Sequence, residues 1–134
     1  MMILIDAGPL VALLHRDDQD HARCVAALRK VRTVLTTTWP PLTEAMYLLS
    51  FSGQAQDALL EMVERGALRV LPIDESDIPR VRVLIQKYQD LPMDLADATL
   101  VRVAEREGIQ EVFTLDRRNF TTYRVGRRAF TIIP

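Results

Sequence analysis

Two aspartates in this chain each follow a short apolar run of the kind that forms a buried strand. Asp6 comes after residues 1–5, which read Met-Met-Ile-Leu-Ile, and Asp116 comes after residues 111–115, which read Glu-Val-Phe-Thr-Leu. Where strands alternate with helices, such runs pair into a mostly parallel sheet, and ligands bind at the carboxyl ends of its strands. The two aspartates therefore predict an α/β fold with an acidic site at one edge of its sheet.

The hydrophobic pattern along the rest of the chain alternates between strand-like and helix-like segments. Strands are predicted at residues 2–5, 34–37, 68–71, 112–115 and 130–133, and helices at residues 8–14, 20–31, 40–53, 54–65, 74–88 and 94–107. Strands separated by helices imply right-handed crossovers, so we expect one three-layer α/β/α domain with a mostly parallel sheet over residues 1–134. The pattern does not give the order of the strands.

The charge is nearly balanced overall but is uneven along the chain. A net charge of −1 gives no global sign of nucleic-acid binding, yet five arginines and no acid follow Asp116: Arg117, Arg118, Arg124, Arg127 and Arg128. Guanidinium groups suit bidentate contact with phosphate, so Arg117 and Arg118 are candidates for holding a phosphate backbone. A biased base composition and an exposed turn explain the same residues equally well.

Cysteine and histidine are too few for a thiolate or imidazole metal site. Cys24 is the only cysteine and lies in an apolar helical segment, which predicts a buried structural thiol in a reducing compartment. His15 and His21 lack a further ligand at zinc spacing. The first residues do not form a signal peptide and no apolar run reaches the length of a membrane span, so we expect a cytoplasmic protein without a membrane partner.

Three more acids lie early in predicted helices. Asp97 sits in the otherwise apolar segment 95–101, where an unpaired carboxylate is costly. Asp94 precedes it by about one helical turn, so both lie on one face. Glu44 lies early in the predicted helix 40–53 among apolar neighbours, although an exposed stripe is its alternative.

Each acid also has a purely structural interpretation. Asp6 and Asp94 can cap the helices that follow them, and Asp116 can begin a turn. Asp97 then falls at the third helical position, where the helix dipole favours a carboxylate. Brought to one edge, however, these carboxylates repel one another, and a divalent cation relieves the repulsion. We therefore predict a Mg²⁺ or Mn²⁺ site.

Other phosphate chemistries fit the sequence less well. The glycines are isolated, so no Gly-rich phosphate loop exists, and no Gly-x-Ser-x-Gly elbow is present. An aspartyl-phosphate enzyme needs a second acid just after its strand-end Asp, where this chain has Ala7 and Gly8. A phosphatase acting on small substrates is therefore a weaker alternative.

Five segments, in order, resemble the PIN-domain nucleases and, within them, the VapC-type toxins of toxin–antitoxin systems. They are residues 3–10 (Ile-Leu-Ile-Asp-Ala-Gly-Pro-Leu), 17–21, 42–45, 93–98 (Met-Asp-Leu-Ala-Asp-Ala) and 113–120 (Phe-Thr-Leu-Asp-Arg-Arg-Asn-Phe), and they span nearly the whole chain. The resemblance implies a PIN fold and a Mg²⁺- or Mn²⁺-dependent ribonuclease. For a toxin it also implies an RNA substrate, an antitoxin partner and a homodimer.

The resemblance also implies roles for individual residues. It maps the family's core acids onto Asp6, Glu44, Asp97 and Asp116, and a further acid onto Asp94. Thr114 matches a polar residue that often supports the site. Ala7 and Gly8 stand where many VapC proteins have Thr-Ser, so the polar support from that turn is missing.

The resulting hypothesis is metal-assisted hydrolysis of an RNA phosphodiester. Asp6 and Asp97 are expected to hold a cation directly, with Asp116 completing that site or a second one and Glu44 orienting or deprotonating the attacking water. Asp94 is a further candidate metal ligand. An alternative of a different class is a non-catalytic PIN-like module that binds RNA or protein.

Contacts with partners are expected beside this site. Arg117, Arg118 and Thr114 are the candidate substrate-binding residues. The apolar stretches 11–14 and 46–51 are candidates for binding an antitoxin helix or a second copy of the chain, although core packing explains most of their residues.

Overall fold

The centre of the molecule is a parallel sheet, seen in a computed structural model that covers residues 1–134. Its five strands are β1 (Met2–Ile5), β2 (Val34–Thr37), β3 (Leu68–Val70), β4 (Glu111–Phe113) and β7 (Thr131–Ile133). They are ordered β3-β2-β1-β4-β7, and every neighbouring pair is parallel. The strands that precede Asp6 and Asp116, β1 and β4, are therefore direct neighbours.

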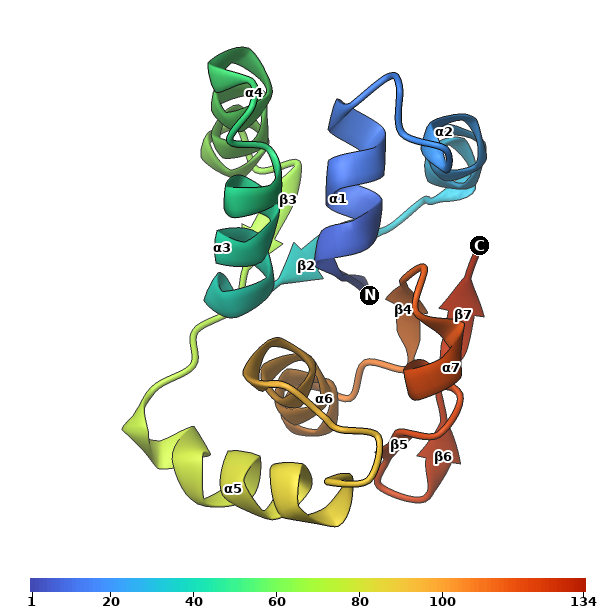
Figure 1. Cartoon of the computed structure of the whole chain (residues 1–134). Coiled ribbons are helices and arrows are strands. Elements are labelled where there is room, and N and C mark those ends of the chain that lie inside the picture. The colour runs from blue at the N-terminus through green and yellow to red at the C-terminus, as the bar shows by residue number, and fades with distance from the viewer.

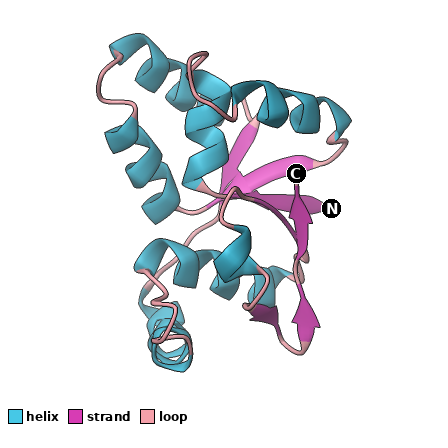
Figure 2. Cartoon of the chain, turned by 45° about the vertical axis from the view of Figure 1, so that its right-hand side comes forward, coloured by secondary structure: helices cyan, strands magenta, loops and turns pink.

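Helices connect the strands and cover both faces of the sheet (Figure 1; Figure 2). They are α1 (Ala7–Leu14), α2 (His21–Lys30), α3 (Trp39–Leu48), α4 (Gly53–Glu64), α5 (Ile78–Lys87), α6 (Leu95–Glu107) and the short α7 (Arg117–Phe120). A 3₁₀ turn, η1 (Glu75–Asp77), leads into α5, and a small antiparallel hairpin, β5 (Arg124–Val125) with β6 (Arg128–Ala129), follows α7. No helix is long and apolar enough to cross a membrane.

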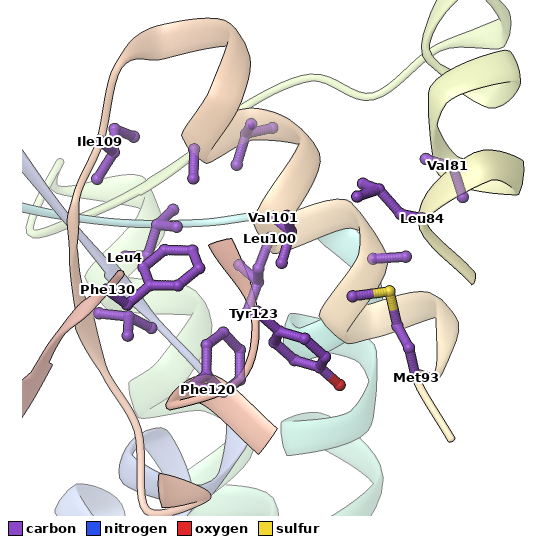
Figure 3. Close-up of a cluster of buried hydrophobic side chains, with 14 of the residues drawn as sticks. Leu4, Val81, Leu84, Met93, Leu100, Val101, Ile109, Phe120, Tyr123 and Phe130 are labelled. Atoms are coloured by element: carbon purple, nitrogen blue, oxygen red, sulfur yellow. The ribbon is translucent and has the colours of Figure 1, made fainter. Parts of the chain in front are cut away.

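Two apolar cores lie on the two faces of the sheet because strand side chains alternate in direction. Leu4 and Val112 pack with α5, α6 and the aromatic residues that follow β4 (Figure 3). Ile3, Ile5 and Phe113 face the other core, which is formed with α1 to α4. Burial on both faces explains why the strands are nearly continuous apolar runs.

The helix α6 runs through the first of these cores and is fixed at its C-terminal half by ion pairs. The carboxylate of Asp77, almost fully buried, accepts hydrogen bonds from Arg102 Nε at 2.7 Å and from Arg106 Nη1 at 3.0 and 3.1 Å. Arg106 also donates to the carbonyl of Pro72. Gly108, with φ of +70°, ends the helix in the left-handed conformation that glycine adopts without strain.

The expected three-layer α/β/α architecture is confirmed, but some boundaries differ. The predicted helix 74–88 begins as a 3₁₀ turn, because Pro79 lacks the N–H that a continuous α-helix would need there. The predicted helix 40–53 ends at Leu48, and the predicted strand 112–115 ends at Phe113. The helix α7 and the hairpin that follows it were not predicted.

The lone cysteine has the buried structural placement that the sequence predicts, and His21 also has a structural role. Cys24 is fully buried in the core formed by α1 to α4. His21 is the first residue of α2, and its Nδ1 lies 2.7 Å from the carbonyl oxygen of Ala12. Neither side chain lies among the acids discussed next.

Candidate functional site

Three of the candidate acids are helix N-caps at the carboxyl edge of the sheet. Asp6 directly follows β1 and caps α1, its Oδ1 accepting from the N–H of Ala7 at 2.8 Å. Asp116 follows β4 and caps α7, with Oδ1 accepting from the N–H of Asn119 at 3.2 Å. Asp94 caps α6. The structural interpretation of these residues is therefore correct, and it does not compete with the functional one.

Asp94 and Asp97 share the first turn of α6. The Oδ1 atom of Asp94 accepts from the backbone N–H of Asp97 at 2.8 Å. Negative charge at this end of a helix is favoured by the exposed amides and the dipole. The two side chains differ in surroundings, because Asp94 is exposed whereas Asp97 is only 7% exposed.

The acids lie close enough together to influence one another's ionisation. The charges of Glu44 and Asp94 raise the pKa of Asp6, although burial raises it more. Partial burial raises the pKa of Glu44, and Asp94 adds to that rise. The charges of Asp6, Asp94 and Asp116 likewise act on Asp97, so each of the five acids that the sequence singled out lies within electrostatic reach of other members of the group.

Asp6 is half-buried at the end of β1. Burial raises its pKa to about 6, against the opposing effects of its hydrogen bonds from Ala7 and Thr114. Thr114 Oγ1 donates to Asp6 Oδ2 at 3.1 Å. Both carboxylate oxygens of Asp6 therefore already have one protein donor.

Asp97 is the other strongly perturbed acid. Burial raises its pKa to about 7, and the charges of Asp6, Asp94 and Asp116 add to the rise. The hydroxyl of Tyr123 opposes the rise by donating to Asp97 Oδ2 at 2.7 Å. A carboxylate with these surroundings is costly to ionise in the absence of a positive charge.

Thr114 links the two strand-end acids. Its side chain is fully buried; the hydroxyl donates to Asp6 and accepts from the backbone N–H of Asp116 at 3.0 Å. This placement suits a positioning role rather than the substrate contact that we predicted for it. It also supplies polar support to Asp6 that the turn at Ala7 and Gly8 lacks.

Glu44 approaches the cluster from α3 and is exposed. The helix that carries it is fixed to α6 by a buried hydrogen bond between the hydroxyls of Thr38 and Thr99, 2.8 Å apart. Thr38 is the N-cap residue of α3, and Thr99 lies two positions beyond Asp97. The hydroxyl pair therefore fixes the helix of Glu44 against the helix of Asp97.

The oxygen-rich donor set suits a hard divalent cation such as Mg²⁺ or Mn²⁺. No three His, Cys, Asp or Glu side chains converge closely enough to form a complete ligand set. Mg²⁺ is commonly bound through one or two carboxylates and retains several waters, so the open arrangement of these acids fits it. The raised pKa values of Asp6 and Asp97 are a second observation in favour of the fit, because a cation would offset the cost of burying the two charges and the smaller repulsion from the other acids.

The arginines that follow Asp116 differ in whether their side chains bond within the protein. Arg117 Nη1 donates to the carbonyl of Pro134 at 2.8 Å, which links α7 to the last residue of the chain. Arg124 Nη1 donates to three carbonyls, those of residues 121 to 123, and so closes the end of α7. Arg118 is exposed beside Asp116 and has no ion pair within the chain.

Sequence reasoning missed Tyr123 and the Thr38–Thr99 pair. Tyr123 is fully buried, and burial, with the adjacent Asp97 carboxylate, raises its pKa, so its hydroxyl remains a donor. Its partner lies 26 residues away in sequence, and no spacing rule joins a residue after α7 to the first turn of α6. Thr38 could have been suspected only as a helix cap.

These surroundings predict how the stability of the metal-free protein depends on pH. Unfolded Asp protonates near pH 4, whereas folded Asp6 and Asp97 protonate near pH 6 and 7, so between these values the folded state binds more protons. The free energy of unfolding of the metal-free protein is therefore unaffected by these two carboxyls below about pH 4, and it falls as the pH rises from there towards about 7. One pKa unit corresponds to about 1.4 kcal/mol, so the loss reaches several kcal/mol.

Urea unfolding in EDTA at pH 5 and pH 8 measures this loss. The double variant Asp6→Asn/Asp97→Asn is the reference, because it removes the two titrating carboxyl groups while keeping the shape of the side chains. We expect the wild type to lose more stability than the variant between the two pH values. An equal loss in both proteins would show that neither acid has a raised pKa.

Comparisons with known proteins identify the family and the fold. The model of the PIN domain family matches residues 3–126. Ribonuclease VapC26 of Mycobacterium tuberculosis (strain ATCC 25618 / H37Rv) is 29% identical over 135 residues, covering 98% of this chain and 100% of the relative.

Solved structures of similar fold include a toxin and a toxin-antitoxin complex. VapC20 of Mycobacterium tuberculosis, described as a Sarcin-Ricin loop cleaving toxin, superposes with a TM-score of 0.76 at 20% identity, covering 82% of this chain and 86% of that one. A toxin-antitoxin complex from Klebsiella pneumoniae gives a TM-score of 0.72 at 17% identity, covering 98% of this chain and 96% of that one. At these identities the superpositions establish the fold.

Proposed function

Because this chain belongs to the PIN domain family, we propose that it is a divalent-metal-dependent endoribonuclease and the toxin of a toxin–antitoxin pair. The observation that carries the proposal is the gathering of Asp6, Asp97 and Asp116 with Glu44 and Asp94 at the carboxyl edge of the sheet. The likeness to Ribonuclease VapC26 over the whole chain supports ribonuclease activity.

Asp6 and Asp97 are the residues proposed to hold Mg²⁺ or Mn²⁺, with Asp116 and Asp94 available to complete that site or a second one. When bound, the cation would act as a Lewis acid, lowering the pKa of water and stabilising charge on the phosphate. The chain's own residues prepare the site for this role. Thr114 holds Asp6 and the turn of Asp116 together, and Tyr123 holds Asp97.

Glu44 is proposed to orient or deprotonate the attacking water. It is exposed at the rim of the cluster, and its raised pKa makes it a stronger base than an ordinary surface glutamate. Its helix is fixed to α6 through Thr38 and Thr99, which keeps the carboxylate near Asp94.

The test of this proposal is RNA cleavage by the purified protein. Structured and unstructured RNAs, including a sarcin–ricin loop RNA, are incubated with Mg²⁺, Mn²⁺ or EDTA. The proposal predicts internal cleavage with either cation and none in EDTA. The alternative, a non-catalytic PIN-like module, predicts RNA or protein binding without cleavage; the presence of all the core acids argues against it.

Arg117 and Arg118 are proposed to contact the RNA backbone, and their replacement gives a separate prediction. The double variant Arg117→Ala/Arg118→Ala should bind RNA more weakly, and the slope of log K against log salt should flatten by about one for each phosphate that the variant no longer neutralises. Arg118 is expected to account for most of the change, because Arg117 already donates to Pro134.

Fluorescence anisotropy at several salt concentrations measures this slope. Arg65→Ala is the matched control, because Arg65 is exposed at the end of α4 and has no ion pair. If the salt slope is unchanged in the double variant, both arginines are residues of an exposed turn that do not contact RNA.

An antitoxin and a second copy of the chain are the proposed protein partners. The end of α3 carries exposed apolar side chains: Tyr47 is 76% exposed, Leu48 45% and Phe51, just beyond the helix, 61%. The predicted stretch 11–14, by contrast, is at least partly buried in the core. The exposed side chains of Tyr47, Leu48 and Phe51 are therefore the better candidates for burial in a homodimer or beneath an antitoxin helix, whereas Leu49 between them is buried in the core.

A further inference from the structure

The shortest hydrogen bond to the candidate acids comes from a tyrosine that has no assigned role. Tyr123 is fully buried, and its hydroxyl donates to Asp97 Oδ2 at 2.7 Å. The Oδ1 atom of Asp97 accepts no hydrogen bond from the protein. One oxygen of this carboxylate is thus held by the protein and the other is free.

The ring of Tyr123 is itself held rigidly. It makes edge-to-face contacts with Phe120 and with Tyr88, each with ring centroids 5.0 Å apart. Figure 3 shows it beside Phe120 in the core, with its hydroxyl oxygen at the outer end of the ring. A hydroxyl on a packed aromatic ring has little freedom, so it fixes the atom to which it donates.

The segment between Asp116 and Tyr123 connects the acids to one another. Asp116 caps α7 at one end, and Tyr123 lies three residues beyond Phe120, where the helix ends. Thr114, just before this segment, holds Asp6. Asp6, Asp116 and Asp97 are therefore all bound to residues within one stretch of the chain, 114–123.

We propose that Tyr123 is a positioning residue that holds Oδ2 of Asp97 and leaves Oδ1 free for a divalent cation. The inference rests on the proposed function, since it takes Asp97 to be a metal ligand. Groups that orient metal ligands typically contribute about 10- to 100-fold to metal affinity. Tyr123 supplies that orientation from the core, where it does not touch substrate.

The chain offers a matched control in Tyr88. Tyr88 belongs to the same aromatic cluster and is 8% exposed, and its hydroxyl accepts from the N–H of Arg124 at 3.2 Å. Tyr88→Phe and Tyr123→Phe therefore each delete one hydrogen-bonded hydroxyl from the same cluster. Only the second change removes a contact to an acid of the site.

The test measures Mn²⁺ affinity by isothermal titration calorimetry for the wild type and both variants. We expect Tyr123→Phe to bind Mn²⁺ about 10- to 100-fold more weakly and Tyr88→Phe to match the wild type. At limiting Mn²⁺ the kcat for RNA should fall in Tyr123→Phe and recover at saturating Mn²⁺, while KM for RNA stays unchanged. Loss of metal affinity that excess metal restores is not expected of a residue that serves folding alone.

Unchanged Mn²⁺ affinity in Tyr123→Phe would overturn the inference, as would equal weakening in both variants. A wild-type protein that binds Mn²⁺ without cleaving RNA would overturn the proposed function alone, because the affinities still decide the role of Tyr123. A wild-type protein that binds no Mn²⁺ would overturn both.

A second measurement uses the wild type and applies if Tyr123→Phe does not fold. The chain has three tyrosines, so labelling their ζ carbons with ¹³C gives three resonances; Tyr47→Phe and Tyr88→Phe identify two of them, and the third belongs to Tyr123. Adding Mg²⁺ should shift the resonance of Tyr123 and leave that of Tyr88 in place. An unmoved Tyr123 resonance at saturating Mg²⁺ would overturn the inference.

Discussion

Asp6→Asn and Asp97→Asn should each abolish Mg²⁺-dependent RNA cleavage while leaving the fold intact. An amide keeps the shape of the side chain and an acceptor oxygen for Ala7 or Tyr123, but it loses the charge that binds a cation. Metal-ion catalysis contributes several kcal/mol of transition-state stabilisation, so we expect kcat/KM to fall on the order of a thousand-fold or more. The same variants should melt at higher temperature in EDTA at pH 8, because a buried, repelled charge has been removed.

Initial rates under metal-limited conditions, with melting curves in EDTA, measure both effects. Asp57→Asn is the control, because Asp57 is an exposed acid on α4 whose side chain has no ion pair or hydrogen bond. Full activity in either site variant would remove that residue from the metal site. A lower melting temperature would instead show that its charge stabilises the metal-free fold.

Induced expression of this chain alone should arrest bacterial growth, and the Asp6→Asn variant should not. A toxin that cleaves RNA stops translation, whereas a variant without metal-dependent activity is a folded but inert protein. Growth curves after induction measure the effect, with immunoblots to confirm equal amounts of the two proteins. Coexpression of a neighbouring gene's product should restore growth if that product is the antitoxin.

The negative charge of the site is the physical basis on which an antitoxin would inhibit the toxin. A metal-free acidic cluster attracts a guanidinium, and an arginine carried on an antitoxin segment competes with Mg²⁺ for the same carboxylates. The toxin role would be abandoned, and the nuclease role kept, if active wild-type protein left growth unaffected and no neighbouring product co-purified with it.

The main features of the fold were predictable because the signals for them are local. The apolar run of β1 ends at Asp6, and the periodicity of residues 95–107 marks α6, as the structure confirms. The order of the strands was not predictable, because it depends on which edge of the sheet each crossover joins. The hairpin of β5 and β6 was missed because its strands are only two residues each.

The acids of the site were also found from local signals, whereas the residues that hold them were not. Asp97 was conspicuous as a charge among apolar neighbours, and its burial is confirmed. Thr114 was suggested only by family resemblance, and its bond to Asp6 spans 108 residues of sequence. Tyr123 gave no signal, because a buried aromatic residue near the end of a chain ordinarily serves packing alone.

The double duty of the aspartates, as helix caps and as site acids, has a genetic consequence. A bacterium that survives an unrestrained toxin is expected to carry a change that inactivates it. Replacing Asp6, Asp94 or Asp116 by a residue that cannot cap also costs about 1 kcal/mol of stability, whereas Asn or Ser keeps the cap. Replacement by Asn or Ser thus leaves a folded but inactive protein, while replacement by other residues favours loss of the protein by degradation.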